Sequence, residues 1–276
     1  MSQRKHAGKT VLVTGGARGI GLAIARRFAA EGADLALFDL AADALEAARD
    51  ALVAGGDGAD GADGADGTDG TEGVEGSVPM IFAGSVAAPD DVERCFAMLD
   101  ARWQRLDVLV NCAGILVVTP AVELDIDAWR DSLDVNLTGT WLTCRAAGAR
   151  MIRAGGGAIV NISSVMGNGG APERAAYCAS KAGVIGLTRS LAVEWGRHGV
   201  RVNSVAPTAT RTDLVQNLVD RGAVDRAAIA DRTPLRRMAE PDEVAAVCSF
   251  LASEDAAMIS GHDLAVDGGW MANYYI

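Results

Sequence analysis

A glycine-rich turn between an apolar strand and a helical pattern is the feature that most constrains the fold of this chain. The residues from Lys9 to Thr14 are apolar at their centre, the turn from Gly15 to Gly21 has the spacing Gly-x-x-x-Gly-x-Gly, and a helical pattern follows through residue 29. Glycine permits positive φ and close backbone approach, and a helix N-terminus offers N–H groups to a pyrophosphate. This order predicts a dinucleotide-binding unit. Its predicted contacts are Gly15, Arg18, Gly19, Ile20 and Gly21.

Asp39 indicates which dinucleotide binds. A second apolar run, from Leu35 to Phe38, ends at this acid, 24 residues after Gly15. A carboxylate accepts hydrogen bonds from ribose hydroxyls and repels a 2′-phosphate, so Asp39 predicts NAD rather than NADP. Arg18 argues for NADP, because a guanidinium can pair with that phosphate. We give Asp39 more weight, since the acid must be neutralised or moved before a phosphate fits.

Tyr177 and Lys181 are four residues apart in a chain that holds only three tyrosines and three lysines. An ammonium ~4 Å from a phenol favours the phenolate by ~4 kcal/mol at an effective dielectric constant of ~20, or roughly 3 pKa units. Tyr177 is therefore predicted to be a general acid/base near neutral pH. A surface contact across one helical turn is the simpler alternative.

Ser164 lies thirteen residues before Tyr177, after a run of β-branched and other apolar residues that predicts a buried strand. A hydroxyl at this position can stabilise charge on a substrate oxygen. The alternative is a serine that only caps the next segment.

With these motifs the chain resembles the single-domain short-chain dehydrogenase/reductases, a family of NAD(P)-dependent oxidoreductases, over nearly its whole length. Further matching segments are Asn111-Cys112-Ala113-Gly114, Asp134-Val135-Asn136-Leu137, Val205-Ala206-Pro207 and Val266-Asp267-Gly268-Gly269. The resemblance implies that Tyr177 is the acid/base, that Ser164 orients the substrate oxygen, and that Lys181 binds the nicotinamide ribose and lowers the tyrosine pKa. It also implies that Asn136 completes a proton relay.

The resemblance implies further cofactor contacts, which are Ser85, Val86, Asn111, Ala113, Gly114, Tyr177, Lys181, Pro207, Thr208, Thr210 and Thr212. Three positions depart from the family pattern: Ser85 stands where an acid often contacts adenine, Cys112 replaces an asparagine, and Thr208 replaces a glycine. We expect the adenine contact to persist through Val86 and the backbone, and Thr208 to narrow or re-aim the pocket at the nicotinamide end.

Alternating strand and helix patterns predict one domain, residues 1–276, with an α/β Rossmann-type fold, a doubly wound parallel sheet flanked by helices. Residues 55–77 are an acidic Gly/Asp-rich insertion that we expect to be disordered. Its seven acids account for much of the net charge of −11, because the rest of the chain has 29 acidic and 25 basic residues. The acidic balance argues against nucleic-acid binding.

Composition also indicates where the protein is located and whether it binds a metal. No apolar run approaches the ~18 residues of a membrane helix, so we expect a cytoplasmic protein without a membrane partner. The five cysteines have no metal-type spacing and predict free thiols, and the three histidines lie far apart, so no metal site is predicted.

The predicted function is NAD-dependent hydride transfer between nicotinamide and a secondary alcohol or ketone, most simply a sugar, a polyol or a small hydroxy compound. Residues 166–174 and a substrate lid at residues 208–240 are expected to line the pocket, with Asn168, Glu173 and Arg174 as its polar side chains. The alternatives are a 3-oxoacyl-thioester (acyl-carrier-protein) reductase and, from another class, a non-catalytic dinucleotide-binding sensor. The resemblance implies a homotetramer or homodimer.

Overall fold

Seven parallel strands form one sheet in the computed structural model of the protein, which describes residues 4–56 and 77–273. The strand order is β3-β2-β1-β4-β5-β6-β7. The strands are β1 (Thr10–Thr14), β2 (Asp34–Asp39), β3 (Met80–Ala83), β4 (Val108–Asn111), β5 (Gly157–Ile162), β6 (Val200–Pro207) and β7 (Asp263–Val266). The central strands β1 and β4 are buried along their whole length because both faces of the sheet are covered by helices.

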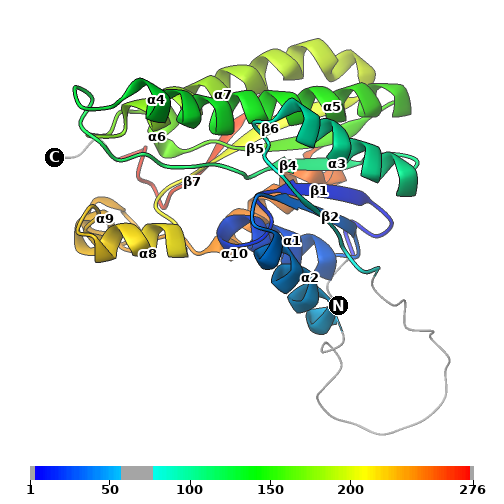
Figure 1. Ribbon diagram of the computed structural model, residues 1–276, viewed down its shortest axis with the longest axis horizontal. Helices are drawn as coiled ribbons and strands as arrows, with labels where there is room; N and C mark the ends of the chain where they lie inside the picture. Colours follow the sequence, from blue (N-terminus) through cyan, green and yellow to red (C-terminus); the bar gives the residue numbers. More distant parts are fainter. Residues whose placement is uncertain (1–3, 57–76, 274–276) are drawn as a thin grey trace, which may run out of the picture.

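Two layers of helices cover the sheet (Figure 1). On one face lie α1 (Gly19–Ala30), α2 (Ala42–Gly56) and α10 (Pro241–Ala252). On the other lie α3 (Pro89–Arg102), α5 (Gly139–Ala154) and α7 (Ala175–Trp195). Each layer buries its own apolar cluster, with the alternate side chains of β1, Val11 and Val13 on one face and Leu12 on the other. The predicted doubly wound α/β fold is thus confirmed.

Shorter helices and turns lie at the two edges of the sheet. They are α4 (Ile126–Leu133), the π-helical turn η1 (Asp134–Thr138), α6 (Val165–Asn168), the 3-10 turns η2 (Gly196–His198) and η3 (Glu254–Ala256), α8 (Asp213–Asp220) and α9 (Arg226–Arg232). In Figure 1, α8 and α9 stand apart from the two helical layers. Both belong to residues 208–240, the predicted lid.

The strand order reverses between β1 and β4, which pair directly. In an open parallel sheet, ligands bind outside the carboxyl ends of the strands at such a reversal. Gly15, Asp39, Asn111 and Ser164 all stand at the carboxyl end of a strand or just beyond it. The fold therefore brings the predicted nucleotide and catalytic residues to one edge of the sheet.

The expected insertion at residues 55–77 lies largely outside the described residues. Residues 55 and 56 differ from the expectation, because they belong to the last turn of α2. Residues 57–76 are not described.

Two glycines of the first turn are required by steric contact. Gly15 has φ +65°, and a Cβ there would lie 2.7 Å from the Ala113 backbone nitrogen. A Cβ on Gly21 would lie 1.9 Å from the Gly15 carbonyl oxygen. Because both obstacles are backbone atoms, no rotamer change can relieve them. The turn therefore fixes β1, α1 and the segment after β4 against one another.

We predict that Gly21→Ala lowers the free energy of unfolding by more than ~2 kcal/mol, since a methyl group there must displace backbone. Gly196→Ala is the matched control, because Gly196 has helical φ −56° and ψ −39° with nothing within 4 Å of its added Cβ. That control should be neutral or stabilising by up to ~1 kcal/mol. Urea unfolding of both variants measures the difference, and equal stabilities would show that the turn can relax.

Candidate active site

The N-terminus of α1 is suited to an anion. Its first residues follow Arg18 in extended conformation, no side chain caps the helix, and no acid stands in its first turn. Uncapped N–H groups and the positive end of the helix dipole attract a phosphate. The side chain of Arg18 is exposed rather than folded over the turn.

Asp39 lies against the same turn. One carboxylate oxygen accepts from the Ala17 backbone N–H at 3.2 Å, and the other accepts from the Ala41 N–H at 3.2 Å. The carboxylate is only half-buried, which leaves it open to a further donor. Its position at the end of β2 beside the glycine turn fits the predicted role of a ribose acceptor.

The start of the predicted lid lies against the glycine turn. A Cβ on Gly19 would meet Thr212 Cγ2 at 3.4 Å, so the start of α8 and the glycine turn are neighbours. Thr212 also caps α8 by accepting from the Val215 N–H. Thr208 and Thr210 are buried beyond Pro207, and the Thr210 hydroxyl donates to the Thr208 carbonyl at 3.0 Å. The predicted lid contacts thus lie beside the predicted nucleotide turn.

Ser164 and Tyr177 meet at the carboxyl end of β5. Burial raises the pKa of Tyr177, and the neighbouring Ser164 hydroxyl partly opposes this shift. Ser164 Oγ also accepts from the Met166 N–H at 3.1 Å as the cap of α6. The capping alternative is thus confirmed, whereas the role of Ser164 toward a substrate oxygen stays a prediction.

Lys181 points into the same site from the next turn of α7. Its side chain is 4% exposed, and Nζ donates to the Ile162 carbonyl oxygen at 2.7 Å. Nζ lies 5.7 Å from the centre of the Tyr177 ring. Burial lowers the pKa of Lys181 to about 8. The carbonyl bond and the closed surroundings fix the ammonium beside the phenol.

The expected depression of the tyrosine pKa is not what the structure shows. Desolvation of the phenolate outweighs every favourable contact, so the pKa of Tyr177 is raised. The burial of Lys181 also favours its neutral amine over the ammonium. Burial was missing from the sequence argument, and it reverses the sign.

Asn136 lies within a π-helical turn, η1, and is fully buried. Its side-chain oxygen accepts from the Ile115 N–H at 2.8 Å, and its amide donates to the Ile115 carbonyl at 2.9 Å and to Ser180 Oγ at 3.0 Å. Its backbone carbonyl accepts from the Thr140 hydroxyl. Asn136 therefore ties the segment after β4 to α7. Single π turns are frequent at functional sites, and no sequence signal announced this one.

Asn111 and Val86 are turned away from the site. The Asn111 amide donates to Asn161 Oδ1 at 2.9 Å, and its oxygen accepts from the Thr143 hydroxyl at 2.7 Å, in a network that is 4% exposed at Asn111. Val86 packs in the core against Gly139. A cofactor contact by either residue would have to come from the backbone. Ser85 is half-buried, and its N–H donates to Asp91.

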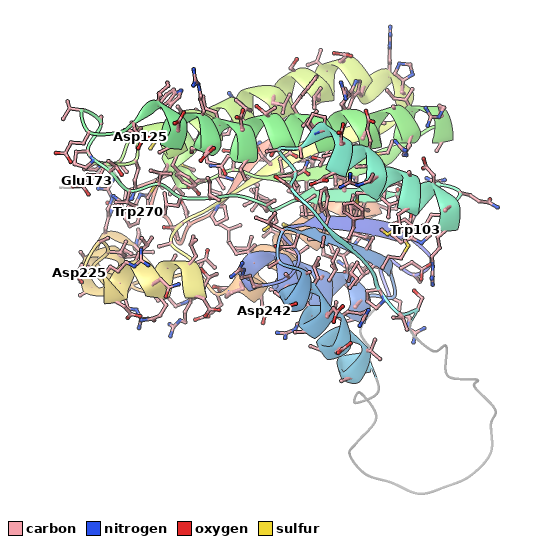
Figure 2. The ribbon with its side chains drawn as sticks, viewed as in Figure 1. Trp103, Asp125, Glu173, Asp225, Asp242 and Trp270 are labelled. Atoms are coloured by element: carbon pink, nitrogen blue, oxygen red, sulfur yellow. The ribbon has the colours of Figure 1, made fainter. Side chains whose placement is uncertain are left out.

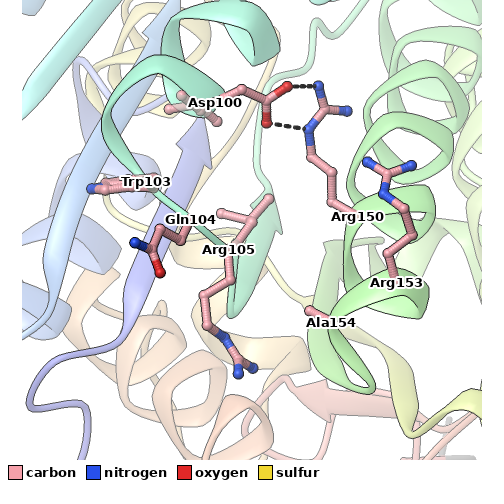
Figure 3. A pocket seen from close by; sticks show the side chains of 9 residues that line it. Asp100, Trp103, Gln104, Arg105, Arg150, Arg153 and Ala154 are labelled. Atoms are coloured by element: carbon pink, nitrogen blue, oxygen red, sulfur yellow. Dashed lines mark hydrogen bonds and ion pairs between the residues drawn. The ribbon is translucent and has the colours of Figure 1, made fainter.

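Two other cavities lie away from these residues. One, of about 180 Å³, lies between the ends of α3 and α5 and is shown in Figure 3. It holds the Arg150–Asp100 pair, with Arg150 Nε 2.7 Å from Asp100 Oδ1. The other, of about 500 Å³, opens near Lys9 and Arg201 at the opposite edge of the sheet. Neither cavity includes Ser164 or Tyr177.

Two protein-family models match this chain. A model described as short chain dehydrogenase matches residues 9–69, and one described as Enoyl-(Acyl carrier protein) reductase matches residues 62–271. The chain belongs to the short-chain dehydrogenase family. This dehydrogenase is an oxidoreductase of CH–OH groups that uses NAD(P).

Individual relatives are similar over their full length. The dehydrogenase is 44% identical to a D-threitol dehydrogenase of Mycolicibacterium smegmatis, over 95% of this chain and 93% of the relative. It is 38% identical to a galactitol 2-dehydrogenase of Cereibacter sphaeroides, over 95% of each chain. A crystal structure described as an NAD(P)-dependent gluconate 5-dehydrogenase from Beutenbergia cavernae, with bound NADP, superposes with a TM-score of 0.85 at 35% identity, covering 99% and 100% of the two chains.

One residue of this site was not found from the sequence. Asp263, at the start of β7, accepts from the hydroxyls of Ser163 and Ser204 at 2.6 Å each and from the Asn168 amide at 2.6 Å. These bonds hold both ends of the segment that carries Ser164. Asn168 therefore faces Asp263 and is engaged there, although it was expected to be a polar side chain of the pocket. A carboxylate opening an apolar strand was the only available signal.

Among the described residues, no group of His, Cys, Asp or Glu side chains is arranged to hold a metal ion. All five cysteines are free thiols. No helix in the described ranges 4–56 and 77–273 is long and apolar enough to cross a membrane.

We predict that the dehydrogenase gains stability from Lys181 as the pH rises. The unfolded lysine binds its proton up to pH ~10.5, but the folded one releases it near 8, so the unfolded state holds more protons between these values. Relative to Lys181→Met, the wild type should gain about 2 kcal/mol between pH 7 and pH 9.5. Denaturant unfolding at both pH values measures the gain. Lys5→Met, at an exposed position, is the control, and a pH-independent difference for Lys181→Met would disprove the desolvated lysine.

Proposed function

We propose that this dehydrogenase transfers hydride between NAD and a secondary alcohol or ketone, and that its substrate is a sugar, a polyol or a small hydroxy compound. The observation that carries the proposal is the contact between the Ser164 and Tyr177 side chains beside the buried Lys181. The D-threitol and galactitol dehydrogenases among its relatives support a polyol.

The residues of the chain fit a nicotinamide dinucleotide. The uncapped α1 N-terminus would hold the pyrophosphate, Asp39 the adenosine ribose, and Lys181 the nicotinamide ribose. When bound, the nicotinamide supplies or accepts the hydride. Glycine at position 114 keeps the approach open, because a Cβ there would lie 3.1 Å from Asn136 Oδ1 and 3.6 Å from Lys181 Nζ.

Each catalytic side chain then has a separate task. Ser164 Oγ, oriented by the Met166 N–H and Tyr177, hydrogen-bonds to the substrate oxygen and stabilises its developing charge. The Tyr177 hydroxyl gives a proton to this oxygen in reduction and takes it back in oxidation. The Lys181 ammonium favours the phenolate when Tyr177 loses its proton. Asn136 hydrogen-bonds to Ser180 and to Ile115 and so holds α7 against the segment after β4. We propose that it also takes part in the proton relay.

Reduction of a 3-oxoacyl thioester is the second candidate. It is supported by a relative described as a 3-oxoacyl-[acyl-carrier-protein] reductase of Synechocystis, which is 36% identical over 95% of this chain. Thioester reductases of the family usually use NADPH, and the Asp39 carboxylate repels a 2′-phosphate. Cofactor choice therefore separates the two candidates.

We further propose a cytoplasmic homotetramer or homodimer that associates through the outer faces of α5 and α7. Trp141 on α5 is 41% exposed and Val193 on α7 is 86% exposed, and Arg145 stacks on the Trp141 ring. Exposed apolar side chains on adjacent helices are typical of an association surface. Light scattering of the purified protein measures the assembly directly, and a monomer would exclude it.

We predict that Tyr177→Phe lowers kcat by ~10²- to 10⁴-fold, because it removes the hydroxyl that transfers the proton and leaves the ring in place. An absorbance screen of sugars, polyols, secondary alcohols and hydroxyacyl thioesters with NAD⁺ and NADP⁺ identifies the substrate and measures the effect. NADH binding, followed by fluorescence, should stay unchanged and serves as the control. Wild-type turnover in the variant would exclude Tyr177 as the acid/base, and a silent wild type that binds NADH would favour the sensor.

We predict that Asp39→Ser lowers the ratio of kcat/KM with NAD⁺ to kcat/KM with NADP⁺ by at least about tenfold, because the repulsion of the 2′-phosphate is removed. Asp43→Asn, on an exposed acid in the first turn of α2, is the matched control and should leave the ratio unchanged. Steady-state rates with both cofactors give the answer. An unaltered ratio in Asp39→Ser would show that other residues select the cofactor.

A further inference from the structure

Arg174 connects the catalytic helix to the lid. It is the residue before α7, three positions ahead of Tyr177. Its Nη1 donates to the Pro172 carbonyl oxygen at 2.8 Å, and its Nη2 donates across to the Ala223 carbonyl oxygen, between α8 and α9, at 3.2 Å. The guanidinium therefore lies between the body of the protein and the lid, where the substrate pocket is expected.

The guanidinium has donor capacity that the protein does not use. Its Nε is buried and has no hydrogen-bond partner. Both of its bonds go to neutral carbonyls, and no ion pair joins it to an Asp or Glu of residues 4–56 and 77–273. An arginine keeps its charge at all working pH values, and a buried N–H without an acceptor costs ~1–3 kcal/mol. An oxygen of a bound molecule would satisfy both the donor and the charge.

The backbone beside Arg174 is held in an unfavourable conformation. Glu173 has φ +61°, and its carbonyl oxygen accepts from the Thr119 N–H at 2.8 Å. Such a conformation in a residue other than glycine persists only where its surroundings impose it, and it is typical of ligand-binding sites. The Thr119 bond ties the segment after β4 to the base of Arg174. In Figure 2 Glu173 marks the body and Asp225 the lid on the same side of the molecule.

The spacing relative to Tyr177 suits a small substrate with two oxygens. Arg174 is the N-cap and Tyr177 the third residue of α7, two positions whose side chains lie near each other at a helix start. A substrate oxygen at Tyr177 and a second oxygen a few bonds away could therefore be bound at the same time. A substrate with a single oxygen would leave the Arg174 Nε–H unsatisfied.

We propose that Arg174 is a substrate-binding and specificity-determining residue, whose Nε–H donates to an oxygen that the substrate carries away from its reacting carbon. The accepting oxygen is a hydroxyl of a polyol or a carboxylate of a hydroxy acid. This inference rests on the proposed function, in which Tyr177 binds the reacting oxygen. The proposal places substrate selection at Arg174, before the start of α7, and proton transfer at Tyr177 in the helix itself.

The test combines a variant with a matched series of substrates. Wild type and Arg174→Met are compared on 2-butanol, 2,3-butanediol, threitol and 3-hydroxybutyrate with NAD⁺. Arg174→Met should lower kcat/KM by at least about tenfold for compounds whose second oxygen binds at Arg174. The kcat/KM for 2-butanol, which has a single oxygen, should change less than about threefold. A loss confined to the diol and threitol identifies a hydroxyl, and a loss confined to the hydroxy acid identifies a carboxylate.

Arg221→Met, the same substitution at an exposed arginine of the lid, should leave all the rates unchanged. An equal loss with every substrate would overturn the proposal, because a mere clasp between body and lid acts on all of them alike. No loss with any substrate would overturn it as well.

A second measurement separates this inference from the proposed function. A wild type without turnover on any compound refutes the proposed function. Calorimetric binding of the same compounds to NADH-loaded protein then still tests Arg174. Weaker binding of the two-oxygen compounds to Arg174→Met, with unchanged NADH affinity and thermal unfolding, supports the assignment. Equal binding by wild type and variant, or no binding to either, contradicts it.

Discussion

The site depends on backbone contacts at the first turn that leave no room for a Cβ. Gly15 touches the backbone at Ala113, and Gly21 touches the Gly15 carbonyl. These contacts bring the end of β1, the start of α1 and the segment after β4 to one point at the strand reversal. An uncapped helix N-terminus is then held beside Asp39, and together they offer a positive dipole and an acceptor to the proposed dinucleotide. Every other functional side chain is placed relative to this point by the order of the strands.

Burial of the catalytic residues sets their protonation more strongly than their mutual attraction does. Tyr177 and Lys181 lie where water is largely excluded, so both neutral forms are favoured: the tyrosine pKa rises and the lysine pKa falls to about 8. The neighbouring Ser164 hydroxyl opposes this only in part. The same exclusion of water strengthens each interaction with charge that develops during reaction. The site therefore disfavours a single charged side chain in the free protein, but it strengthens the attraction between opposite charges that form together during the reaction.

Local patterns predicted the glycine turn, the strand-end acid at Asp39 and the Tyr177–Lys181 pair, because the spacing of these residues is set within one strand, turn or helix. The parallel sheet followed from the same alternation. Asp263 could not be predicted, since its partner Ser163 is 100 residues away and only the pairing of β5, β6 and β7 unites them. The inward turn of Asn111 depends likewise on Thr143 and Asn161. The predicted direction of the Tyr177 pKa shift was wrong for a related reason, because the burial of a side chain depends on the packed fold.

The helix that carries the proposed acid/base begins beside the proposed substrate-binding residue, Arg174. Along α7, Lys181 bonds to the end of β5, Tyr177 contacts Ser164, and Arg174 bonds to the lid. The inner end of this series is fixed to the sheet by the bond from Lys181 to the Ile162 carbonyl. The outer end rests on loop carbonyls at Pro172 and Ala223, which other sequences can supply in other positions. A rigid chemical site and an adaptable recognition site can therefore lie next to each other, because Arg174, the residue before α7, bonds to the predicted lid.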